Sequence, residues 1–119
     1  MNKVVGLGRL AAAITFAAIL STGSSAFAFE CPKHFAEAQA LIDKVKGDMG
    51  GDMSKQMPKE QMALVHSLLD DAKTHLAAGK HNHEKPQGVY DHARAIAKAD
   101  AALGYARAAD MLHFHYMKK

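Results

Sequence analysis

The sequence predicts an all-α protein, a small antiparallel bundle of three helices in up-down-up order. Apolar residues recur every three or four positions in three stretches, at about 32–46, 58–78 and 89–117, and this spacing is typical of amphipathic helices. The connections between these stretches are short, which favours antiparallel neighbours. No strand pattern competes with the helical one.

The first 28 residues have the features of a cleaved signal peptide. Lys3 and Arg9 bracket a short basic start, and Leu10 to Leu20 is an apolar run of 11 residues. Ala26-Phe27-Ala28 then supplies the small residues that signal peptidase accepts. We therefore expect cleavage after Ala28 and export to the periplasm. The run is too short to cross a bilayer of about 30 Å comfortably, so we expect no permanent membrane anchor.

Residues 29–119 are enough for one small helical domain with a thin core. Without Lys3 and Arg9, 13 of the 15 basic residues remain against 12 acidic ones, so this part of the chain is almost neutral and we expect no nucleic-acid partner. Its one cysteine, Cys31, cannot form an internal disulfide. The thiol is therefore free, bridged to another molecule or bound to a metal.

Proline and glycine residues set the expected bounds of the first two helices. Pro32 begins the first and Gly47 ends it, while Pro58 opens the second and Gly79 closes it before a polar loop at 80–87. The apolar faces of these two helices are predicted to consist of Phe35, Ala38, Leu41, Ile42 and Val45, and of Met62, Val65, Leu69, Ala72 and Leu76.

The third helix is rich in alanine and runs from about Val89 towards Met117. Its core face is predicted to hold Val89, Ala93, Ile96, Ala97, Leu103, Gly104, Ala108 and Met111. Asp100 and Arg107 fall on the same stripe, so they form an ion pair that fixes the register, or Asp100 faces an internal site. At about 1.5 Å per residue this helix is near 43 Å long and the first only near 21 Å. The segment from residue 49 to 57 must cover part of the difference, or a second copy of the chain must do so in a homodimer.

All eight histidines, six of the seven methionines and the cysteine follow residue 28. An antiparallel bundle gathers them at two ends, which we name the Cys-His pole and the Met-His pole. The Cys-His pole is predicted to contain Cys31, His34, His75, His81, His83 and His92. The Met-His pole is predicted to contain Met49, Met53, Met57, Met62, His66, Met111, His113, His115 and Met117. Imidazole and thioether together suit copper, and imidazole alone also suits zinc and nickel.

Spacing decides which of these side chains can bind one ion together. Residues four apart share a helix face, so Met111 pairs with His115, and His113 with Met117. His81 and His83 fall in the expected loop, where both rings can turn to one ion. Cys31 and His34 are three apart on the apolar side of a helix start, where the positive end of the helix dipole favours a thiolate.

Ordinary structural roles compete with metal binding at several of these positions. Met62 and Met111 occupy apolar positions, and they fit the core better than they fit a ligand set. His66 and His92 fit a solvated flank, and His34 fits a packed, hydrogen-bonded ring. A core role suits Met49, Met53 and Met57 less, because their surroundings are polar and rich in glycine.

The sequence shows no catalytic machinery. It lacks a Cys-x-x-Cys-His haem-attachment motif, a His-Glu-x-x-His zinc motif, a nucleotide-binding loop and a nucleophile elbow. The Glu-x-x-His pairs of di-iron bundles are also missing. We therefore expect a binding protein rather than an enzyme.

Residues 66–100 contain His75, the Gly79-Lys80 pair, His81 and His83, followed by His92-Ala93 on an alanine-rich helix. In these features this stretch resembles the small histidine-rich metal-binding proteins of bacterial periplasms. This resemblance implies a helical bundle that binds copper and other divalent metals through these histidines. The chain departs from that family in lacking its regular histidine repeats and in adding Cys31 and the methionines. A second similarity links 57–61, Met-Pro-Lys-Glu-Gln, to the helix-opening motif of periplasmic stress chaperones and metal sensors, which implies an interaction role.

These observations lead to two functional hypotheses. The first is a periplasmic protein that binds copper, as Cu(I) or Cu(II), to buffer it or deliver it to a copper-handling protein, with zinc or nickel as alternates. The second is an interaction module or stress chaperone that needs no metal, because the short first helix leaves apolar surface of the third uncovered.

Overall fold

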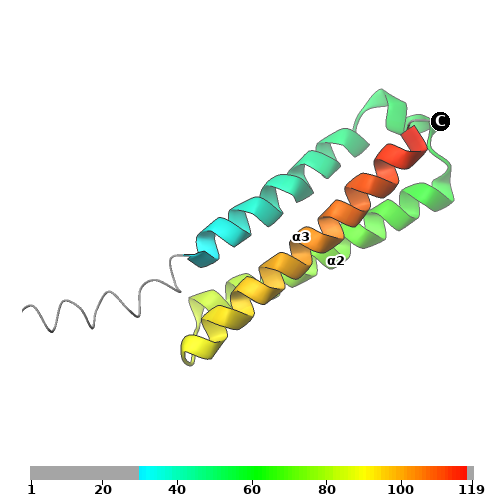
Figure 1. Cartoon of the computed structure of the whole chain (residues 1–119). Coiled ribbons are helices and arrows are strands. Elements are labelled where there is room, and N and C mark those ends of the chain that lie inside the picture. Colours follow the sequence, from blue (N-terminus) through cyan, green and yellow to red (C-terminus); the bar gives the residue numbers. More distant parts are fainter. Residues whose placement is uncertain (1–29, 118–119) are drawn as a thin grey trace, which may run out of the picture.

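The computed structural model describes residues 30–117, and these residues form three long helices packed side by side (Figure 1). The first is helical from residue 30 to 49 and is called the 30–49 helix. A short 3₁₀ helix, η1 (Asp52–Gln56), follows, and α2 (Lys59–Glu84) and α3 (Val89–Met117) complete the bundle. No strand occurs in this part of the chain, so the all-α fold is confirmed. The predicted signal peptide lies outside the described residues.

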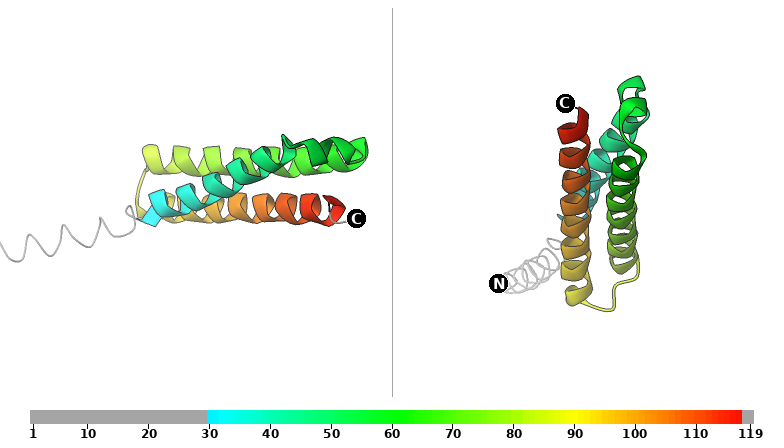
Figure 2. Two further views of the ribbon diagram at one scale, coloured as in Figure 1. Left: turned by 90° about the horizontal axis from the view of Figure 1, so that it is seen from above. Right: turned by 90° about the vertical axis from the view of Figure 1, so that its right-hand side faces the viewer.

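The helices have the up-down-up order expected from the short connections. Cys31 lies beside His92, and Lys44 lies beside Asp110, so the 30–49 helix and α3 run in the same direction. The α2 helix runs in the opposite direction beside them, as the two further views show (Figure 2). Within residues 30–117, no helix combines the length and apolarity that a membrane span requires.

The core faces of the first two helices are those predicted. Phe35, Ala38, Ile42 and Val45 are buried, with Leu41 partly buried beside them. The α2 helix buries Val65, Leu69, Ala72 and Leu76, and Met62 packs at the edge of the core. Large apolar side chains at helical spacing fix these two faces because their burial contributes the most free energy per residue.

The predicted core face of α3 is wrong. This helix buries a stripe of small residues at spacings of four and three, namely Ala95, Ala99, Ala102, Ala106 and Ala109. Val89 and Met111, which were expected inside, are 63% and 72% exposed, and Ile96 and Leu103 only flank the core. The larger side chains of the other two helices fill the space, so α3 contributes its narrowest face.

The α2 helix also continues five residues beyond the predicted end at Gly79. Gly79 is buried, and a Cβ atom at this position would lie 2.9 Å from the backbone oxygen of Ala95 in α3. The glycine therefore allows two helices to approach closely instead of ending one. The helix ends at Glu84, before Pro86, because the residue preceding a proline is disfavoured in helical conformation. His81 and His83 consequently lie on a helix, and the prediction that they occupy a loop is wrong.

The segment after the 30–49 helix covers the end of α3, and this is one of the two ways of covering the longer third helix that the sequence predicted. Ser54 of η1 and Met57 just after it are buried against the bundle.

The expected pairing of Asp100 with Arg107, or with an internal site, is wrong. Asp100 is 54% exposed and its carboxylate lies 2.6 Å from His34 of the 30–49 helix.

Candidate metal centre

Three side chains that could hold a metal ion meet at the Cys-His pole, one from each long helix. Cys31, His83 and His92 each place a ligand atom within 4.8 Å of the other two. Among the described residues, these three form the one group of at least three Cys, His, Asp or Glu side chains whose donor atoms lie close enough to hold one ion. The thiol is fully buried, and both imidazoles are partly exposed.

Local sequence explains how each donor reaches this point. Cys31 is on the apolar face of the 30–49 helix, one turn before Phe35. His83 reaches the pole because α2 continues one turn past Gly79, and His92 lies in the first turn of α3. The His83 ring makes T-shaped contacts with Phe35 and with His92, at 5.5 Å and 5.4 Å between ring centroids.

The hydrogen-bonding state of this cluster favours an added ligand. The Cys31 Sγ lies 4.0 Å from His92 Nδ1 and donates a long hydrogen bond of 3.6 Å to the His92 carbonyl. The His83 Nδ1 is buried and has no hydrogen-bond partner among the described groups. An unpaired buried nitrogen costs about 1–3 kcal/mol, so the cluster contains a polar atom that the protein itself leaves unsatisfied.

Burial raises the pKa of the Cys31 thiol; a backbone hydrogen bond opposes this shift and the nearby charge of Glu30 reinforces it. The side chain is therefore a thiol rather than a thiolate when no ion is bound. A metal ion must displace this proton to bind the sulfur, so binding is coupled to proton release. The sequence-based expectation that the helix dipole stabilises a thiolate here is opposed by desolvation, which is the largest effect.

The remaining predicted residues of the Cys-His pole lie apart from this cluster. His34 is 2.6 Å from the Asp100 carboxylate, and His75 stacks on Tyr105 with centroids 5.1 Å apart and planes inclined by 11°. His81 projects into solvent. The structure thus brings together three of the six predicted residues, and Cys31 meets His92 rather than His34.

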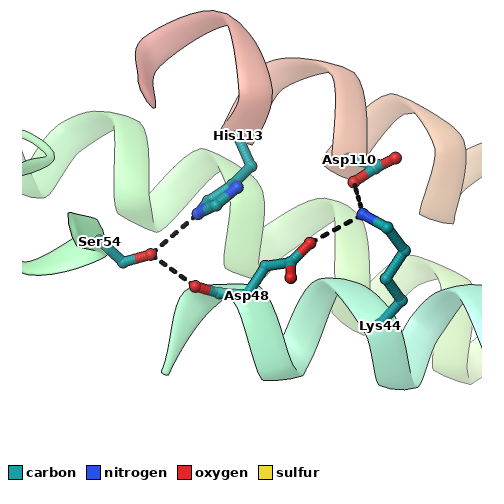
Figure 3. Close-up of polar contacts among 5 residues, drawn as sticks. All are labelled: Lys44, Asp48, Ser54, Asp110 and His113. Atoms are coloured by element: carbon teal, nitrogen blue, oxygen red, sulfur yellow. Dashed lines mark hydrogen bonds and ion pairs between the residues drawn. The ribbon is translucent and has the colours of Figure 1, made fainter. Parts of the chain in front are cut away.

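At the Met-His pole, His113 belongs to a buried hydrogen-bond network (Figure 3). The Ser54 hydroxyl lies 2.9 Å from His113 Nε2 and donates to the Asp48 carbonyl at 2.8 Å. Because the hydroxyl has only one proton, His113 Nε2 must carry a hydrogen and donate to Ser54. Nearby, Lys44 contacts Asp48 and Asp110 at 2.8 Å each, which joins the 30–49 helix to α3.

The methionines of this pole have mixed surroundings. Met57 is buried, and Met49, Met62 and Met117 pack partly buried against the core. Met49 and His66 line one hollow, whereas Met117 and His113 line another with Ser54. Met111 and His115 are exposed and share a groove with Phe114, so the four-residue spacing does place them together. The side chain of Met53 lies outside the described part. A ligand role for these residues stays a prediction.

No family model, curated protein or solved structure matches the chain. The resemblance to histidine-rich periplasmic metal-binding proteins therefore stays a prediction from residues 66–100.

Proposed function

We propose that this protein binds a transition-metal ion through Cys31, His83 and His92, and that it buffers or delivers this ion. The observation that carries the proposal is the convergence of one thiol and two imidazoles from three helices, with His83 Nδ1 buried and unsatisfied. Together with the signal peptide expected at residues 1–28, it points to a periplasmic role with a copper-handling protein as partner.

The donor set favours copper, with zinc or nickel as alternates. Thiolate is a soft ligand that prefers Cu(I) and Zn(II), and a set of two histidines and one cysteine is also typical of copper centres. Three donors leave a position open on a four-coordinate ion, whereas purely structural zinc sites are closed by four protein ligands. An open position allows an incoming ligand to remove the ion, which a buffering or delivery protein requires.

Titration of residues 29–119 with Cu(I), Cu(II), Zn(II) and Ni(II) tests the proposal. Cys31→Ser and His92→Gln should each weaken binding at least about tenfold, which corresponds to about 1.4 kcal/mol. His81→Gln is the matched control, because this histidine is on the same helix as His83 but projects into solvent. If no metal binds more tightly than about 10 µM, roughly 7 kcal/mol, the proposed function is wrong.

The Met-His pole is tested separately by replacing Met49, Met53 and Met57 with leucine. Leucine keeps a similar volume without the soft sulfur donor. A contribution of these thioethers predicts weaker Cu(I) binding with unchanged Zn(II) binding. Unchanged binding of both ions would assign the three side chains to packing.

A second function is favoured by exposed apolar surface near the end of α3. Met111 and Phe114 are 72% and 62% exposed, and they line a groove with Ala108, Leu112 and His115. Contiguous apolar surface of this kind marks interaction sites, which fits a helical module that needs no metal. Metal-free protein that remains monomeric and binds no apolar dye would argue against this function.

A further inference from the structure

We propose that the metal ion acts as a clamp that fastens the beginning of the 30–49 helix to α2 and α3. This inference rests on the proposed function and concerns its regulation. When the ion leaves, the first turns of the 30–49 helix separate from the other two helices while its far end stays in place. Metal occupancy then controls how much apolar surface the bundle exposes.

The clamp follows from where the three donors are attached. Cys31 belongs to the first described turn of the 30–49 helix, His83 to the last turn of α2 and His92 to the first turn of α3. The α2 and α3 helices are already joined at this pole by the short connection at 85–88. The 30–49 helix has no such connection there, so a bond from Cys31 to a shared ion would tie it to both neighbours.

The two ends of the 30–49 helix are fastened unequally. At the Met-His pole, Lys44 contacts Asp110 at 2.8 Å, and Ser54 joins the carbonyl of Asp48 to buried His113. The chain itself also continues there into η1 and α2 (Figure 1). These contacts and the covalent connection hold that end whether or not an ion is bound.

At the Cys-His pole the described polar contacts of this helix include none as buried as the Ser54–His113 hydrogen bond, although the 2.6 Å contact of His34 with Asp100 is shorter than the contact of Lys44 with Asp110. The Cys31 thiol donates a 3.6 Å hydrogen bond, and the His34 to Asp100 contact is partly open to solvent. In the chain that begins at residue 29 after the expected cleavage, the first amides of this helix lack acceptors within the helix, which makes its first turn prone to open. The end that carries the metal-binding thiol is therefore the end from which opening begins.

Opening at this end would uncover a defined apolar surface. Phe35 packs directly over Gly79, at 3.3 Å from the position of a Cβ atom there, and Ala38 is fully buried. Separation of the first turns exposes Phe35 together with the faces of α2 and α3 around Gly79 and Ala95. The α2–α3 pair stays intact because the closest contact at Gly79 is with the backbone of Ala95 in α3, and neither residue belongs to the turns that move.

Hydrogen exchange of residues 29–119, measured by mass spectrometry with and without Zn(II), tests the clamp. Zn(II) is the probe because it is not redox-active. At a free concentration of 100 times the measured dissociation constant, a segment that opens only in the metal-free state should exchange about 100-fold more slowly. We expect this slowing in residues 31–40, with a much smaller change in residues 41–49 and in the middle of α2 and α3.

Cys31→Ser provides the matched variant, since it removes one donor and keeps the size of the side chain. In this variant Zn(II) should still slow exchange near His83 and His92 but should no longer protect residues 31–40. Equal slowing in all three helices, or no slowing at 31–40 while Zn(II) is bound, would overturn the clamp and leave the proposed function standing. Absence of Zn(II) and copper binding by the unmodified chain would overturn both.

Discussion

Replacing Gly79 with alanine should destabilise the bundle, although alanine is the better helix former. A Cβ atom at this position lies 2.9 Å from the Ala95 backbone oxygen and 3.3 Å from both Lys98 Cβ and Phe35 Cε1. The nearest of these atoms belongs to backbone, which cannot move aside as the end of a flexible side chain can. Overpacking of this kind costs about 1–3 kcal/mol. The helix-propensity gain of about 1 kcal/mol offsets only part of it, so a net loss of about 1 kcal/mol is expected.

Gly104→Ala is the control for this prediction. Gly104 is also inside a helix, but nothing lies within 4 Å of a Cβ atom built on it. Its replacement should therefore show the propensity gain alone and stabilise the protein by about 1 kcal/mol. Both variants can be compared by thermal unfolding followed by circular dichroism, in which a change of about 1 kcal/mol corresponds to a melting shift of about 4–8 °C for a domain of this size. Equal stabilisation by the two substitutions would refute the close helix contact.

Three further predictions concern the polar groups. Ser54→Ala leaves the buried His113 Nε2–H without an acceptor and should lower the free energy of unfolding by about 1–3 kcal/mol. Ser67→Ala is the control, because Ser67 is exposed and its replacement should be nearly neutral. Equal effects of the two substitutions would contradict the hydrogen-bond network. The carboxylates of Asp110 and Asp48 raise the pKa of Lys44, so its stabilising contribution is complete at neutral pH and is lost as the pH rises beyond the ordinary lysine range. Lys44→Met should abolish that alkaline loss but lower neutral stability by no more than about 1 kcal/mol, because the side chain is largely exposed. Because burial raises the pKa of Cys31, Zn(II) affinity should rise with pH while the thiol is protonated, and Cys31→Ser should reduce the slope of log affinity against pH by about one. An unchanged slope would show that the sulfur is not a ligand.

The predictability of the helix faces depended on side-chain size. Phe35, Ile42 and Leu69 are large apolar residues with polar neighbours, so their spacing gave the buried side directly. On α3, alanines occur on every side, and the few large residues dominated the projection. Val89 begins the helix and Met111 lies off the buried stripe, so both remain exposed, and the stripe that packs is distinguished only by its small size.

The sequence was enough to predict which donor residues gather at the Cys-His pole, but not which of them lie close enough to share one ion. The topology was enough to place Cys31, His83 and His92 at one end of the bundle. Selecting them from six candidates requires the rotation and height of each helix, which depend on packing at Gly79. The sequence signal that pointed the wrong way was this glycine, which resembles a helix end but serves a close crossing.

Close packing of the helices also links the alanine stripe to the candidate metal centre. Interaxial distances between helices range over about 8–10 Å with the size of the contacting side chains, so small residues at Ala95 and Gly79 hold α3 near α2. This proximity keeps the three donor atoms within 4.8 Å. Ala95→Leu should therefore weaken Zn(II) binding although it changes no donor, whereas leucine at exposed Ala97 should not. If a folded Ala95→Leu protein, checked by circular dichroism, binds Zn(II) as tightly as the Ala97→Leu control, helix spacing does not set the geometry of the centre.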